Sequence, residues 1–166
     1  KKSLFSLPLC YMGFSGYINP FTLESHVNSK IPTINLVITI LHEIAHQIGY
    51  SSEKEANFVA YLSAIKSDDR YIQYAGSIFA LKYFYKELHK LNKSGVEKSL
   101  KKIKSGVLKN IKEGNDFWKN YENPFEFFFD RTYDIYLKIN GQDSGIKSYN
   151  EVVSLIINYH KYIEEF

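Results

Sequence analysis

The chain contains one short motif, His42-Glu43-Ile44-Ala45-His46, that constrains its fold more than any other stretch. On an α-helix the two histidines of this motif stand one turn apart on the same face, so both imidazoles can reach one zinc ion. Glu43 lies beside them and can act as general base towards a zinc-activated water. We therefore predict a helix here, with His42 and His46 as zinc ligands and Glu43 as the catalytic residue.

A catalytic zinc site has three protein ligands and an open fourth position, so the motif requires one more ligand. If the motif helix continued to Glu53, the seven residues after His46 would carry the chain about 10.5 Å away from the metal. The stretch Gly49-Tyr50-Ser51-Ser52 instead predicts a turn, after which a helix over about residues 52–67 would bring Glu53 back. We therefore predict Glu53 as the third ligand.

Glu55 is the alternative third ligand. Ser52 and Glu55 have the S-x-x-E spacing of a capping box, which gives Glu55 a structural role and favours Glu53 as the ligand. Asn57 shares a helix face with Glu53 and with small residues that would allow the two helices to approach closely. We expect Asn57 to accept a hydrogen bond from a zinc-bound histidine.

The motif helix, predicted over about residues 33–49, carries apolar side chains on most of its faces. Such a helix is typical of a buried, central position in the fold. The motif side chains are then expected to lie deep in the protein, where an unpaired charge is costly unless a metal or a partner compensates it. This argument for a metal is independent of the motif itself.

The remaining sequence predicts an α+β fold that is predominantly α-helical, with a small N-terminal β element. The first 31 residues predict turns and two strands, at residues 16–18 and 23–27, rather than helix. These strands either border the cleft, where a peptide can add to an edge, or merely cover the core. Apolar periodicity predicts further helices over about residues 69–91, 125–140 and 148–164. We predict one domain, 1–166, made of a strand-and-turn region (1–31), a two-helix zinc clamp (32–67) and a helical remainder (68–166).

Charge and composition exclude several classes of partner and site. A lysine-rich stretch with apolar residues at 3–4 spacing, from Val96 to Ile111, predicts an outer amphipathic helix, with contact to an anionic membrane surface as the alternative. A net charge of +3 is too small to indicate a nucleic-acid partner. The single cysteine, Cys10, excludes an internal disulfide and cysteine-rich zinc sites. No apolar run reaches the roughly 20 residues of a membrane helix, so we expect this part of the protein to be soluble.

Three blocks of the sequence resemble a bacterial family known only as a domain of unknown function, whose members are regarded as membrane-anchored zinc metallopeptidases. The blocks are MGFSGYINPFTLESHVN, HEIAHQIGYSSEKEANFVAYL and YDIYLKINGQDSGIKSYNEVV. In that family, transmembrane helices precede the metallopeptidase region. The resemblance implies a membrane-anchored protein with this domain outside the cytoplasm, and the start Lys1-Lys2-Ser3, without Met, fits a fragment of such a chain.

The segment Glu53-Lys54-Glu55-Ala56-Asn57 is also similar to the E-x-x-A-D segment of gluzincin proteases. In gluzincins the first Glu is the third zinc ligand, which corresponds to Glu53, whereas Glu55 falls on a variable position and Asn57 replaces an acidic residue. The block GIKSY makes Tyr149 the first candidate for stabilising the oxyanion, with Tyr136 second. These similarities imply a zincin-like fold.

The sequence therefore predicts a zinc-dependent metallopeptidase that hydrolyses peptide bonds of a peptide or protein substrate. Two alternatives use the same residues differently. One is a peptide-binding module without turnover. The other is a structural zinc module whose fourth position is closed by a side chain, for which Glu55 is the nearest candidate.

Overall fold

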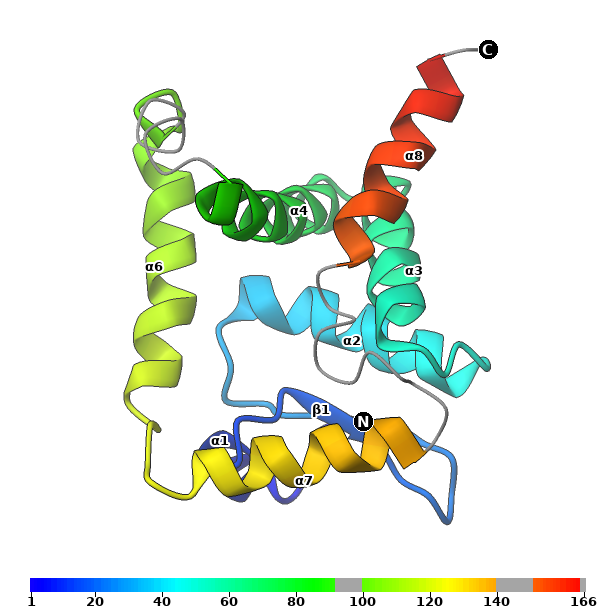
Figure 1. Ribbon diagram of the computed structural model, residues 1–166, viewed down its shortest axis with the longest axis vertical. Helices are drawn as coiled ribbons and strands as arrows, with labels where there is room; N and C mark the ends of the chain where they lie inside the picture. Colours follow the sequence, from blue (N-terminus) through cyan, green and yellow to red (C-terminus); the bar gives the residue numbers. More distant parts are fainter. Residues whose placement is uncertain (92–99, 140–150, 165–166) are drawn as a thin grey trace.

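Helix α2 (Thr33–Gln47) lies at the centre of the computed structural model and contacts α3, α4 and both strands (Figure 1). The structure describes residues 1–91, 100–139 and 151–164. Its elements are α1 (Ser6–Tyr11), β1 (Gly16–Ile18), β2 (Ser25–Val27), α2, α3 (Glu53–Ile65), α4 (Arg70–Leu91), α6 (Ser105–Lys119), α7 (Glu126–Ile139) and α8 (Val152–Glu164). The predicted class, α+β with mostly helix and a small sheet, is confirmed.

Two apolar clusters hold the central helices together. The first lies between α2, α3 and α4, and the second joins α3 and α4 to α8. Small residues allow the close packing of α3 on α4: a Cβ atom at Gly76 would lie 2.7 Å from the Ala64 Cβ. The buried members are Ile34, Ile38, Ala60, Ala64, Ala75 and Ile78 in the first cluster, and Tyr61, Ala80, Val152, Val153 and Ile156 in the second.

Helix α2 is central but not buried on every side, which corrects the prediction from its apolar sequence. Ile40 and Ile44 are 38% and 41% exposed, so one side of the helix faces solvent. The side chains of His42 and His46 are 15% and 16% exposed to solvent. The histidines therefore lie at the wall of a pocket rather than deep in the core.

The sheet consists of β1 and β2, which pair antiparallel with Gly16 opposite Val27. The second strand begins at Ser25 rather than at residue 23 as predicted, because Leu23 has a positive φ of 55° that extended backbone does not allow. On its other side Val27 forms a parallel bridge with Lys2. Within the described residues β1 pairs with β2 on one side and with no strand on the other, so it is an edge strand.

The short helix α1 was not predicted, because its residues were assigned to turns and strands. Pro8 is the third residue of this helix, and a proline is tolerated in the first turn, where the missing N–H has no intrahelical partner. Leu9 and Cys10 are buried, and the Ser6 hydroxyl donates to the Ser3 carbonyl over 2.7 Å. Tertiary burial, rather than a periodic pattern, therefore stabilises this helix.

The basic helix begins later than the sequence predicts. Helix α6 starts at Ser105 and contacts α4 (Figure 1). Val107 and Ile111 pack against the first apolar cluster from the outside. Val96 lies outside the described residues. Among the helices that the structure describes, none combines the length and apolar character that crossing a bilayer requires.

Candidate metal centre

A Schellman turn ends helix α2 directly after the motif. Gly49 has a positive φ of 111°, and its N–H donates to the His46 carbonyl over 3.0 Å. The Tyr50 N–H donates to the Ala45 carbonyl over 3.1 Å, and this second hydrogen bond completes the Schellman turn. The chain reverses here and α3 begins at Glu53, so the predicted return of this carboxylate is confirmed.

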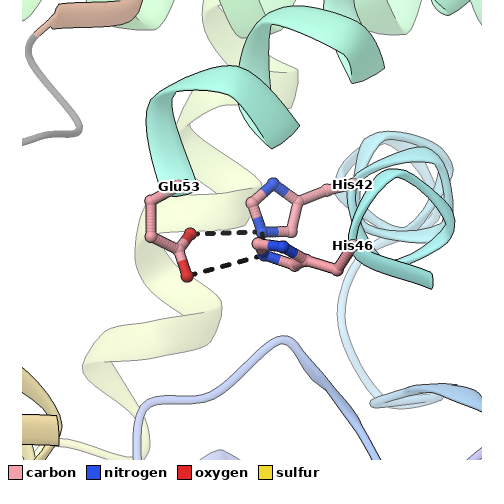
Figure 2. Close-up of side chains that lie close together, drawn as sticks. All are labelled: His42, His46 and Glu53. Atoms are coloured by element: carbon pink, nitrogen blue, oxygen red, sulfur yellow. Dashed lines mark hydrogen bonds and ion pairs between the residues drawn. The ribbon is translucent and has the colours of Figure 1, made fainter. Parts of the chain in front are cut away.

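Figure 2 shows the Glu53 carboxylate facing the imidazoles of His42 and His46. The two Nε2 atoms lie 3.0 Å apart, the Glu53 Oε2 lies 3.3 Å from the Nε2 of His42, and Oε1 lies 3.5 Å from that of His46. Ligands placed about 2.0–2.1 Å from a tetrahedral zinc would be about 3.3–3.4 Å from one another. These three side chains could therefore hold a metal ion, and within the described ranges no second group of His, Cys, Asp and Glu side chains could.

The turn after α2 also orients one of the histidines. The Nδ1 of His46 donates to the Tyr50 carbonyl over 2.7 Å, so its Nε2 faces Glu53. This nitrogen can donate to the carboxylate when the ring is protonated and can bind a metal when the ring is neutral. Burial lowers the pKa of His46, but the Glu53 carboxylate and the Tyr50 carbonyl together raise this pKa above its ordinary value. The Nδ1 of His42 has no partner in the described part of the chain.

Glu53 is held by a residue far away in sequence. The hydroxyl of Tyr133, on α7, donates to Glu53 Oε1 over 2.6 Å, and the Glu53 side chain is only 4% exposed. Burial alone would raise the pKa of Glu53, but the hydrogen bonds from His42, His46 and Tyr133 outweigh it and hold this pKa well below its usual range. The carboxylate therefore stays ionised, as a metal ligand must.

Glu55 is exposed and is not part of this group. The capping box predicted for it does not form, because Ser52 is the N-cap of α3 but makes no side-chain capping hydrogen bond. The structure thus favours Glu53 over Glu55. Asn57 is buried beside the site, but no hydrogen bond joins it to His42 or His46 in the described residues, so its predicted role stays a prediction.

Glu43 lies next to the group and against strand β1. It is 5% exposed, and a Cβ atom at Gly16 would lie only 2.5 Å from Glu43 Oε1, so the carboxylate touches the strand backbone. Burial raises the pKa of Glu43 to about 7; the nearby imidazoles of His42 and His46 oppose this rise, and Glu53 adds to it. A carboxyl group with this pKa can exchange a proton near neutral pH.

A pocket of about 950 Å³ is lined by the side chains of His42, Glu43, His46 and Glu53. Strand β1 forms one border, α2 and α3 supply the candidate metal ligands, and α4 contributes Phe79, Lys82 and Tyr83. No functional residue was predicted in α4. Lys82 follows Ala75 and Ile78 at helical spacing, and a charged residue on an otherwise apolar helix face could have indicated a functional position.

The structure describes the side chain of neither tyrosine that was predicted to stabilise the oxyanion. Tyr149 lies outside the described residues, and Tyr136 lies in α7 three residues after Tyr133. Among the described residues, Tyr133 and Tyr83 line the pocket, and the Tyr133 hydroxyl donates to Glu53. The order of the tyrosines in the sequence gave no means of choosing them, because the contact spans 80 positions.

Comparison with known proteins gives a family but no characterised relative. No curated protein and no solved structure matches the chain significantly. One family model, described as a protein of unknown function (DUF3810), matches residues 1–157 and thus includes the motif, Glu53 and Tyr133. The chain therefore belongs to the DUF3810 family.

Proposed function

We propose that the protein is a zinc-dependent metallopeptidase with a zincin-like arrangement of its site. One observation carries the proposal: the Nε2 atoms of two histidines and a buried carboxylate lie 3.0–3.5 Å apart at the wall of a pocket. The donor set of two histidines and one glutamate is that of catalytic zinc sites in peptidases. Anchoring of the full-length protein in a membrane stays a prediction from the family resemblance.

A zinc ion bound by His42, His46 and Glu53 would supply a water of lowered pKa and a Lewis acid for the carbonyl oxygen. The protein's own part in proton transfer falls to Glu43. Its carboxylate accepts a proton at Oε1 or Oε2 and returns it to the leaving amine. Support for this role comes from its burial, its position at the pocket and the absence of a hydrogen bond to it from any described residue.

Strand β1 is suited to hold an extended peptide beside Glu43. Its residues Gly16 to Ile18 line the pocket, and in the described residues only one of its edges is paired. An extended substrate could add to the free edge through main-chain hydrogen bonds. Of the two readings of the N-terminal sheet, this placement favours the one in which it borders the cleft.

Tyr133 and Tyr83 are candidates for stabilising the oxyanion. The Tyr133 hydroxyl already lies 2.6 Å from Glu53, so a small rotation would direct it at a carbonyl oxygen near the same site. Burial, with a further contribution from Glu53, raises the pKa of Tyr83 well above its ordinary value, so its hydroxyl remains a donor at neutral pH.

The alternatives make different use of the same pocket. A structural zinc module needs a fourth protein ligand, and Glu55 is exposed and outside the group. A peptide-binding module without turnover would keep both zinc and peptide affinity but would not depend on Glu43 as a base. Turnover is therefore the property to measure.

The test compares wild-type protein, Glu43→Gln and the matched control Glu55→Gln after loading with zinc. We expect the wild type and Glu55→Gln to cleave an unstructured protein such as casein, and Glu43→Gln to lose about 10²–10⁴-fold in rate while it keeps its zinc. Cleavage should stop on chelation and return with zinc. If Glu43→Gln cleaves as fast as the wild type, or if no protein or peptide is cleaved by the zinc-loaded wild type, the proposal is wrong.

A further inference from the structure

We propose that Lys82 forms a subsite that binds a carboxylate of the substrate, so that the enzyme prefers peptides carrying a carboxylate near the cleaved bond. The carboxylate is either an Asp or Glu side chain or the free C-terminus of the peptide. This inference rests on the proposed function, since it names the substrate class of the same pocket.

The placement of Lys82 within the pocket is the first reason. Ala75, Ile78, Phe79 and Lys82 follow one another at helical spacing, and this face of α4 lines the pocket. The face is apolar except for the Lys82 ammonium and the neighbouring Tyr83 hydroxyl. Among the described residues that line the pocket, Lys82 is the single lysine, and no arginine accompanies it.

The second reason is that Lys82 has no acceptor for its charge. It is partly buried, and no hydrogen bond or ion pair joins it to any described residue. More exposed lysines do have acidic partners: Lys54 pairs with Glu151, and Lys90 with Glu87, both over 2.6 Å. Burial lowers the pKa of Lys82, and no neighbouring carboxylate opposes this effect.

A partly buried ammonium without an acceptor destabilises the folded protein, so its presence in a pocket points to a ligand that supplies the acceptor. The carboxylates and histidines elsewhere in the pocket, Glu43, Glu53, His42 and His46, belong to the proposed metal site. A peptide that reaches this site can bring only one common anion, a carboxylate. In surroundings of low polarity the resulting charge-assisted hydrogen bond is stronger than at the surface.

The experiment measures binding rather than turnover, so that it does not depend on catalysis. Zinc-loaded Glu43→Gln protein is titrated with four pools of fluorescent octapeptides, randomised among uncharged residues. The pools carry Glu with an amidated C-terminus, Gln with an amidated C-terminus, Gln with a free C-terminus, and Glu with a free C-terminus. Fluorescence anisotropy gives one apparent Kd for each pool, and the titrations are repeated with Lys82→Met, Lys82→Arg and Lys86→Met added to the same background.

We expect at least one carboxylate pool to bind about tenfold more tightly than the Gln amide pool, as one charge-assisted hydrogen bond allows. The pool concerned identifies the source, side chain or C-terminus. Lys82→Met should abolish the difference, and Lys82→Arg should retain part of it. Lys86→Met, the control, changes an exposed lysine one turn further along α4 that does not line the pocket, and it should leave the difference unchanged.

The proposal is overturned if the pools bind alike, or not at all, or if Lys82→Met weakens all four equally. Lys82→Arg guards against misfolding, because it keeps the positive charge and the length of the side chain. Failure here leaves the cleavage test of Glu43 unaffected. Conversely, a preference for carboxylates in a protein without turnover would support the subsite and contradict the peptidase assignment.

Discussion

The candidate metal ligands and the groups that surround them reach the pocket in different ways. His42, His46 and Glu53 come from twelve consecutive positions, on the end of α2 and the start of α3. Lys82 and Tyr133 come from α4 and α7, and the bond between Tyr133 and Glu53 spans 80 positions. If the proposed function holds, the local group defines the chemistry, and we expect the distant groups to adjust its strength and its specificity.

Removal of Glu53 should give the largest effect and tests the local group. Glu53→Ala takes away one of three ligands, so we expect zinc affinity to fall by more than about 100-fold, beyond the loss typical of an outer hydrogen-bond partner. Competition with a chromophoric chelator measures this affinity. Glu55→Ala, on the exposed side of the same helix turn, should bind zinc like the wild type, and the reverse result would make Glu55 the ligand.

Removal of the Tyr133 hydroxyl tests the distant contribution to the metal. Tyr133→Phe keeps the ring but removes the donor to Glu53 Oε1, and we expect zinc affinity to fall about tenfold. Tyr83→Phe is the control, because it removes a hydroxyl from the same pocket without removing a hydrogen bond to Glu53 that the structure describes. Equal affinities of Tyr133→Phe and the wild type would show that α7 does not contribute to the metal site.

The same contrast explains what the sequence could and could not predict. The placement of His42 and His46 on one face followed from helical spacing, and the return of Glu53 followed from Gly49, whose positive φ completes a Schellman turn. The short helix α1 was missed because buried Leu9 and Cys10 stabilise it through tertiary contacts rather than through a pattern. Tyr133 could not be chosen from the sequence, because its hydrogen bond to Glu53 joins α7 to α3 across 80 positions and no local signal predicts that contact.

The smallest expected effect concerns the stability cost of Lys82. Its pKa is lowered in the folded protein, so folding disfavours the charged form. This cost is complete below the lowered pKa and disappears as the pH approaches 10.5, the ordinary pKa of a lysine side chain. Lys82→Met should therefore raise the free energy of unfolding by about 0.5–2 kcal/mol at pH 7. Thermal unfolding would show a rise of about 2–4 °C per kcal/mol, with Lys86→Met as the unaffected control. A lower melting temperature for Lys82→Met would mean that the ammonium has a favourable contact in the folded protein.

The contact between Gly16 and Glu43 ties the correct pairing of the hairpin to the integrity of the site. A shift of β1 by one position against β2 would place Ser15 or Tyr17 where Gly16 now lies. Either residue carries a Cβ atom, and at this position a Cβ atom would collide with the Glu43 carboxylate at 2.5 Å. A two-stranded sheet this short has little pairing energy with which to specify its own alignment. The buried Glu43 side chain therefore favours the observed register of β1 and β2, because this register places Gly16, which has no Cβ atom, against the carboxylate.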